Sequence, residues 1–244
     1  MKSYSTYGII IKKRNFLEKD RILTIFSRDR GKIEILSKGC RRPGSKLSYC
    51  SDLGVVGRFF LHAGKSLDIL TDFQPIFYPQ EITGDYEKTN FMGAIFSIVN
   101  KLFEFDQPHR KTYALLCEIV ENLNETSVKL NGVVFWAKLS EDLGIRPNLN
   151  TCPVCKDSIN SRDDLCFNDE GEIFHRHCRD LSRKISTDAV KFIKLLLDKD
   201  LFFIRRIKAS ANVLTEAEDY FETYFVWHFG KIINEATLRH FRLI

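Results

Sequence analysis

The sequence has no long apolar run: a membrane-spanning helix needs about twenty consecutive apolar residues, and no stretch approaches that length. The first fifteen residues, MKSYSTYGIIIKKRN, contain an apolar stretch that is too short, and too soon followed by charge, for a secretory signal. The cysteine count of seven is odd, which argues against a framework of disulfides. We therefore expect a protein of the reducing cytoplasm that makes no membrane contact.

Common catalytic motifs are also missing. The sequence has no G-x4-G-K-S/T phosphate-binding loop, no H-E-x-x-H motif and no G-x-S-x-G nucleophile elbow. These absences exclude the nucleotide hydrolases, zinc proteases and serine hydrolases that such motifs mark. We predict that the protein is not an enzyme.

Two pairs of metal-ligand residues with the same spacing lie in the middle of the chain. Cys152 and Cys155 form the first pair, and His175 and Cys178 form the second. C-x2-C closes around a tetrahedral zinc from one tight turn, and a second pair supplies the other two corners. Four protein ligands leave no open position for water, so we predict one structural Zn²⁺ rather than a catalytic ion. Residues 156–174 are polar, and we expect a loop without a core of its own.

The third ligand has two alternatives in the sequence. Cys166 or His177 could replace His175. We prefer His175 because it reproduces the two-residue spacing before Cys178, but the sequence leaves the alternatives open.

The net charge of +5 hides an asymmetry along the chain. Residues 1–48 contain thirteen Lys and Arg against four acids, whereas residues 81–178 contain ten against sixteen. A basic first domain favours a polyanionic partner, because each phosphate it neutralises releases condensed counterions. A solvated basic surface without a partner is the alternative interpretation.

The first eighty residues show the pattern of short strands. The expected strands cover residues 7–11, 21–27, 32–37, 55–62 and 67–71. A turn at residues 28–31 and another at residues 63–65 predict two hairpins. Five short strands favour a small closed barrel, which removes the free edges of the sheet.

Basic residues follow two of these strands. Lys12, Lys13 and Arg14 follow one strand, and Lys38, Arg41, Arg42 and Lys46 lie in the loop after another. If a barrel brings the strand ends together, these two groups form one basic patch of the kind that binds single strands. Aromatic residues on the strands could stack on bases, although most are expected in the core; they are Phe16, Phe26, Phe59 and Phe60.

From about residue 86 the apolar period becomes helical. The predicted helices cover residues 86–102, 113–123, 131–143, 187–199 and 215–235. Gly144 is placed to end the third helix and Thr215 to cap the last. We predict four domains or parts: a barrel at 1–80, helices at 81–150, a zinc module at 151–180 and helices at 181–244.

Four segments carry a resemblance to a known family. They are G-I-I-I-K, L-E-K-D-R-I-L-T-I-F, K-G-C-R-R-P-G-S-K and L-G-I-R-P-N-L-N-T-C-P-V-C. In this order and spacing, the chain resembles the bacterial recombination mediator RecO over essentially its full length.

The resemblance implies an α+β protein of several domains: an N-terminal OB-fold β-barrel, then a mainly α-helical domain that carries a zinc-finger insertion. It implies binding of single- and double-stranded DNA, annealing of complementary strands, and help in loading RecA onto strands coated by single-stranded DNA-binding protein. The implied partners are RecR and the acidic C-terminal tail of that coating protein. The resemblance implies DNA contacts at Lys38, Arg41, Arg42 and Lys46, and the charge pattern adds Lys12 and Arg14. Many relatives have four cysteines as the zinc ligands, whereas this chain has histidine at one of the four positions, His175. Histidine is also a good zinc ligand. A protein-interaction adaptor with only incidental DNA binding is the alternative.

Overall fold

The computed structural model describes residues 3–160, 162–181, 183–201 and 206–233. The chain divides into two compact units, Met1–Glu125 and Thr126–Ile244. Among the described residues, no helix combines the length and the hydrophobicity that crossing a bilayer requires. The four parts predicted from the sequence, with boundaries at 80, 150 and 180, stay a prediction.

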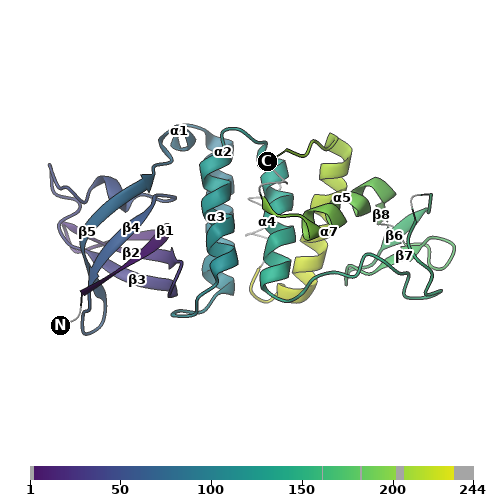
Figure 1. The fold of residues 1–244 in the computed structure, drawn as a ribbon, viewed down its shortest axis with the longest axis horizontal. Coiled ribbons are helices and arrows are strands. Elements are labelled where there is room, and N and C mark those ends of the chain that lie inside the picture. Colours follow the sequence, from purple (N-terminus) through teal and green to yellow (C-terminus); the bar gives the residue numbers. More distant parts are fainter. Residues whose placement is uncertain (1–2, 161, 182, 202–205, 234–244) are drawn as a thin grey trace. The chain divides into compact units, whose positions relative to one another are not determined.

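The first unit begins with five strands that close into a barrel, confirming the OB-like barrel predicted from the sequence (Figure 1). The strands are β1 (Ser3–Phe16), β2 (Asp20–Ser27), β3 (Gly31–Ser37), β4 (Val56–His62) and β5 (Asp68–Phe77). Around the barrel they follow the order β1-β2-β3-β5-β4, and only β3 and β5 pair in parallel. A bulge after Ile10 lets the long β1 pair with both β2 and β4.

Alternating residues of the strands fill the barrel, as the period of two requires. The interior contains Ile10, Leu23, Ile25, Ile33, Ile35, Phe59, Leu61, Leu70 and Phe73. The predicted turn between β2 and β3 is confirmed, and Gly31 supplies its left-handed backbone with a φ of +68°. Between β3 and β4 the chain forms a long irregular loop with one 3-10 turn, η1 (Tyr49–Ser51).

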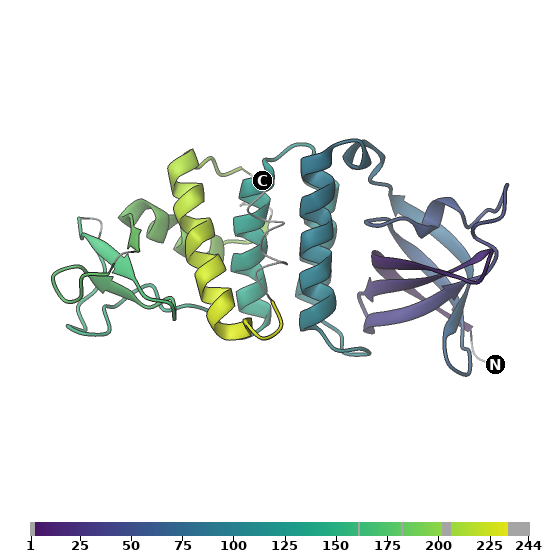
Figure 2. The same cartoon turned by 180° about the vertical axis from the view of Figure 1, so that it is seen from behind.

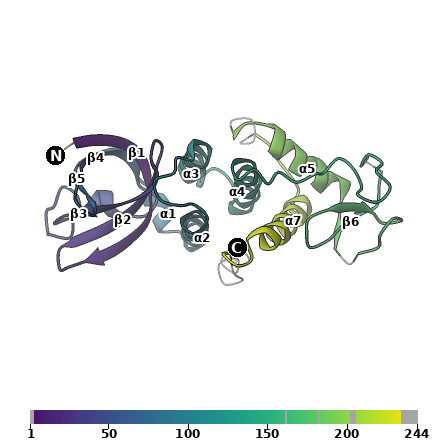
Figure 3. The same cartoon turned by 90° about the horizontal axis from the view of Figure 1, so that it is seen from below.

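Three helices complete the first unit. They are α1 (Gln80–Thr83), α2 (Tyr86–Leu102) and α3 (Arg110–Asn122), and α2 and α3 lie side by side next to the barrel (Figure 3). Phe26 of β2 contacts Phe103 with 5.4 Å between ring centroids. The linker between α2 and α3 also joins β3, because the Asp106 N–H donates to the Lys32 carbonyl at 3.0 Å.

The second unit is built on three described helices, α4 (Val128–Asp142), α5 (Thr187–Asp198) and α7 (Ala211–Phe229). Figure 2 shows α7, in yellow-green, beside α4. The buried Trp136 of α4 contacts Phe225 of α7 with 4.4 Å between ring centroids. Gly144 follows α4 with a φ of +72°, as the sequence predicts for the end of this helix.

The predicted start of the last helix is wrong. The cap is Ser210, whose hydroxyl accepts a hydrogen bond from the Val213 N–H at 3.4 Å. Thr215 lies inside α7, where its hydroxyl donates to the Ala211 carbonyl. Ser210 is the better cap because it lies outside the helix with extended backbone angles, whereas a threonine within a helix can satisfy its hydroxyl on the preceding turn. The predicted end near residue 235 lies outside the described residues.

The segment between the two metal-ligand pairs is not the coreless loop expected from its polarity. Three short strands, β6 (Leu165–Phe167), β7 (Ile173–His175) and β8 (Lys184–Ile185), form a sheet in the order β7-β6-β8. Every residue of β6 and β7 is buried. The polar side chains lie in the turns, so the mean polarity of the segment concealed two apolar strands. We call residues 151–185 the metal module.

Candidate metal centre and nucleic-acid interface

The structure brings together the four residues that the sequence spacing selects. The ligand atoms of Cys152, Cys155, His175 and Cys178 all lie within 4.8 Å of one another. A tetrahedral zinc with about 2.3 Å bonds to sulfur places its ligands roughly 3.8 Å apart, so the group fits such an ion. The cluster could therefore hold a metal ion with no position left for water.

Each ligand pair lies on a tight turn. In the first, the Lys156 N–H donates to the Cys152 carbonyl at 3.0 Å, and Lys156 has a left-handed φ of +66°. In the second, the Cys178 N–H donates to the His175 carbonyl at 2.9 Å. Strand β7 ends at His175 and so fixes its direction, which places both pairs around one point.

A carboxylate orients the histidine. His175 Nδ1 lies 3.3 Å from Cys155 Sγ, and its Nε2 lies 3.0 Å from Asp163 Oδ2. A carboxylate on the second ring nitrogen fixes the tautomer and makes the first nitrogen a better ligand. Asp163 was missed in the sequence analysis because no spacing rule separates it from the neighbouring acids.

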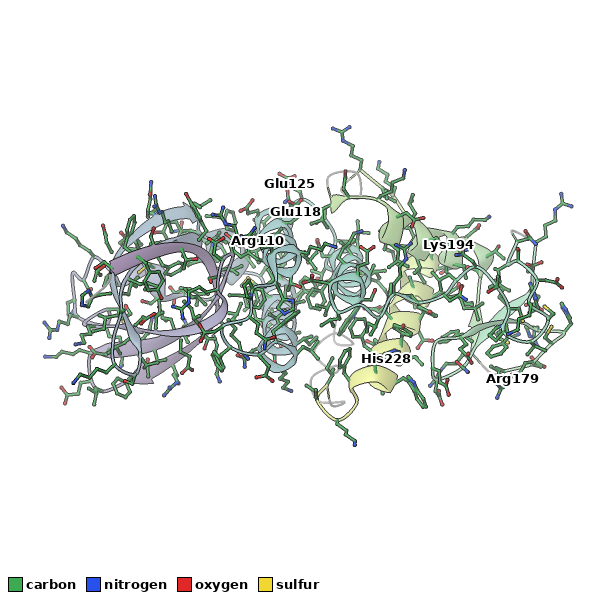
Figure 4. The ribbon with its side chains drawn as sticks, turned by 60° about the horizontal axis from the view of Figure 1, so that its bottom comes forward. Arg110, Glu118, Glu125, Arg179, Lys194 and His228 are labelled. Carbon is green, nitrogen blue, oxygen red and sulfur yellow. The ribbon has the colours of Figure 1, made fainter. Side chains whose placement is uncertain are left out.

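The two alternative ligands lie outside the cluster. The Cys166 thiol is buried and donates to the Arg179 carbonyl, 2.8 Å away. His177 is exposed, and its ring stacks on that of His175 at 5.2 Å. Arg179 is labelled in Figure 4 and places its guanidinium over the Phe174 ring at 5.2 Å. The structure thus favours His175.

The thiols of the first pair differ in acidity. Burial raises the pKa of Cys152, but hydrogen bonds from the backbone N–H groups of Cys155 and His175 outweigh burial and lower it to about 6. The Asp157 N–H lowers the pKa of Cys155, but burial and the two neighbouring thiols outweigh it and raise it to about 11. Cys152 is therefore the more acidic thiol of the first pair, and zinc is bound by thiolates rather than by thiols.

Asp163→Asn is expected to weaken binding of Zn²⁺ by about tenfold to a hundredfold, because the amide no longer accepts the histidine proton as a carboxylate does. Competition with a chromophoric chelator measures the affinity. Asp164→Asn is the matched control, since the exposed Asp164 pairs with Arg176 instead. Equal affinities of the two variants would remove Asp163 from the site.

The candidate DNA contacts are all exposed, and all except Lys12 lie at or near the end of the barrel where β1 ends. Lys12 and Arg14 pair with Thr24 and Ile22 and point outward, because the intervening Lys13 pairs with the core residue Leu23. The other four lie on the basic loop, which we define as residues 38–46 after β3. Their role in DNA binding stays a prediction.

Hydrogen bonds join the basic loop to the β1–β2 turn, residues 17–19. The Arg41 N–H donates to the Lys19 carbonyl at 3.0 Å, and Arg41 Nη1 donates to the Glu18 carbonyl at 3.0 Å. The Gly39 N–H donates to Asp20 Oδ1 at 2.7 Å. These bonds hold the loop beside the end of β1 that carries Arg14, whereas Lys12 lies farther along the strand, opposite Thr24 in the middle of β2.

Most cations of this surface have no nearby carboxylate. Within the described part of the chain, Lys38, Arg42 and Lys46 form no ion pair with a carboxylate, unlike Lys13, which pairs with Asp52. Arg14 has Glu34 as a partner, but the separation is 3.6 Å and the arginine is half exposed. Surface pairs of this kind contribute about 0–1 kcal/mol, so Arg14 can exchange its partner for a phosphate.

The four aromatic residues considered for base stacking differ in their exposure to solvent. Phe26 and Phe59 are fully buried, as expected of most of them, and Phe60 is half-buried under the Arg58 guanidinium. Phe16 is exposed at the end of β1. It is the one of the four that lies beside the basic loop.

Two family models match this chain, and together they cover most of both units. The family descriptions "Recombination protein O N terminal" and "Recombination protein O C terminal" match residues 1–78 and 83–235. The chain belongs to the RecO family. Membership supports a function in DNA repair and recombination.

Several curated proteins named DNA repair protein RecO are similar to this chain. The protein of Desulfitobacterium hafniense (strain Y51) is 26% identical over 227 residues, which cover 89% of this chain and 83% of the relative. That of Alkaliphilus metalliredigens is 25% identical, with 93% and 94% covered. That of Acetivibrio thermocellus is 28% identical, with 88% of each covered. The similarity thus extends over both units.

Proposed function

We propose that this protein is a recombination mediator that binds single- and double-stranded DNA and anneals complementary strands without catalysing a covalent reaction. In this proposal it acts with RecR to help load RecA onto strands coated by single-stranded DNA-binding protein, in the cytoplasm at the nucleoid. Membership of the RecO family supports the proposal. The observation that carries it is the exposed basic loop, which hydrogen bonds to Lys19 and Asp20 hold against the β1–β2 turn.

The mechanism follows from the charges. Cations on flexible side chains hold phosphates and do not read bases, so affinity is tolerant of sequence and strongly dependent on salt. Two strands repel each other through their phosphates. A protein that neutralises part of this charge lowers the repulsion and leaves the base edges free to pair.

The metal has a structural part in the proposal. Zn²⁺ bound by the three cysteines and His175 would hold the two turns and the three short strands of the metal module together. The helices of the second unit would contact the C-terminal tail of the coating protein. We assign no residues to that contact or to the contact with RecR.

The double variant Arg41→Glu/Arg42→Glu tests the proposal. It is expected to weaken binding of a single-stranded oligonucleotide and to reduce the slope of log affinity against log salt by about 1.4, or about 0.7 for each lost phosphate contact. Fluorescence anisotropy across a salt series measures both quantities. An annealing assay on complementary strands, with and without the coating protein, should show a parallel loss.

The matched control is Arg28→Glu/Lys65→Glu, which changes the net charge equally at the opposite end of the barrel, where both residues are exposed. This control should keep most of the affinity. Equal losses in the two double variants would mean that net charge alone sets the binding. Weak binding by the unaltered protein, without any salt dependence, would favour the adaptor alternative.

A further inference from the structure

The tip of the β1–β2 turn presents apolar side chains to solvent. Leu17 is 73% exposed and Phe16 is 38% exposed, although both belong to types that are usually buried. Phe16, the last residue of β1, pairs with Asp20, the first residue of β2, so the turn contains only residues 17–19. The two apolar side chains are therefore presented together at the end of a hairpin.

Leu17 also has an unfavourable backbone conformation. Its φ is +52°, in the left-handed region that favours glycine or asparagine. A leucine there costs about 1 kcal/mol or more, and this one buries little surface in return. Folding alone would be better served by a glycine, so the side chain is better explained by something that it contacts.

Cations lie around this tip, which also carries one exposed acid, Glu18. Lys19 belongs to the turn itself, and the Arg41 guanidinium rests on the Glu18 carbonyl at 3.0 Å. At about 3.3 Å per residue, Arg14 lies roughly 10 Å along the strand from Leu17, and Lys12 roughly 17 Å. Apolar side chains beside cations are complementary to a ligand in which flat apolar rings lie close to anionic groups. Nucleic acid has this combination.

We infer that Phe16 and Leu17 form a wedge that inserts between or stacks on unpaired bases while the basic loop holds the neighbouring phosphates. This rests on the proposed function and deepens it. Apolar side chains unstack base steps in many DNA-binding proteins, and aromatic rings stack on any base. Both contacts use the faces of the bases. The edges stay free to pair, as annealing requires.

Leu17→Gly is the sharpest variant, because glycine tolerates the positive φ and loss of folding cannot explain weaker binding. Phe16→Thr removes the ring and keeps a residue that favours strands. Tyr86→Ala is the matched control, since it removes an aromatic side chain that is 80% exposed elsewhere in the first unit. All are made in the full-length protein.

The measurement compares a single-stranded thymidine oligonucleotide with an abasic strand of the same length, which keeps the phosphates and lacks the bases. The unaltered protein and Tyr86→Ala are expected to prefer the strand with bases. Leu17→Gly and Phe16→Thr should each reduce this preference about tenfold, with the salt slope unchanged. A 2-aminopurine in the strand should change its fluorescence with the unaltered protein and much less with the two variants.

The outcomes separate the two ideas. If the unaltered protein binds both strands equally, or if the wedge variants keep its preference, the wedge is wrong and the proposed function stands. If the unaltered protein binds neither strand, the proposed function fails together with the wedge.

Discussion

Cys152→Ser is expected to unfold the metal module and to abolish binding of Zn²⁺. A structural zinc contributes about 10–16 kcal/mol of apparent binding free energy in small modules, which is as large as the roughly 5–15 kcal/mol that stabilises a whole domain. The sheet of the module is small, since β6 and β7 have three residues each and β8 has two, and its further support is packing on α7, where Phe167 contacts Tyr220. Metal content by mass spectrometry and amide dispersion by NMR measure the two effects.

Cys166→Ser is the matched control in the same module. The thiol of Cys166 donates to a carbonyl at 2.8 Å, and a serine hydroxyl can keep that bond. We expect this variant to retain the ion and the fold with a modest loss of stability. A metal-free Cys152→Ser chain with the NMR dispersion of the unaltered protein would show that the module folds without an ion.

The histidine ligand can be tested separately. His175→Ala should release the ion, whereas His177→Ala should keep it, because only His175 places a nitrogen among the thiols. His175→Cys should also keep it, since a thiolate is a good zinc ligand. If only His177→Ala lost the ion, His177 rather than His175 would be the zinc ligand.

Much of this architecture could be predicted from patterns that involve only a few neighbouring residues in the sequence. Alternation at period two marked the strands of the barrel, and Gly31 and Gly144 marked a turn and a helix end that need a left-handed backbone. The metal ligands could be predicted because zinc requires paired residues on tight turns, so that chemistry determines spacing. These signals act within a few residues and survive in the sequence.

Other features depend on contacts that a sequence does not record. The link between the basic loop and the β1–β2 turn is made partly by main-chain groups, since Arg41 donates its N–H to the carbonyl of Lys19. Any residue has those groups, so no side chain marks the contact. The same holds for Asp163, which is one of several acids until the fold places it against His175. Leu17 gives no signal at all without its φ.

A last prediction concerns the junction of the barrel with its own helices in the first unit. Gly31 has a φ of +68°, and a Cβ there would lie 1.7 Å from the Gln107 carbonyl oxygen. Gly44 has a φ of +73°, but a Cβ there would have no heavy atom within 4 Å. Alanine costs about 1 kcal/mol of backbone strain at either position. Only at Gly31 must something move.

What must move is the linker between α2 and α3. It is held on β3 by the Asp106 N–H, which donates to the Lys32 carbonyl, and the buried Lys32 Nζ donates to the Asn100 carbonyl in the adjoining α2 at 2.7 Å. Displacing the linker and the end of α2 would leave these polar groups without partners in a buried place. We therefore expect Gly31→Ala to cost about 3–5 kcal/mol and Gly44→Ala about 1 kcal/mol.

Hydrogen exchange of the amides in β1, β2 and β3 measures this difference in the whole chain. A single unfolding midpoint is unsuitable here because the chain has two compact units, which can unfold separately. The pair of variants isolates the steric part, because the backbone strain is common to both. Equal losses would mean that the linker yields without cost and that Gly31 is needed only for its turn. A larger loss at Gly31 would show that the start of β3 joins the barrel to its helices.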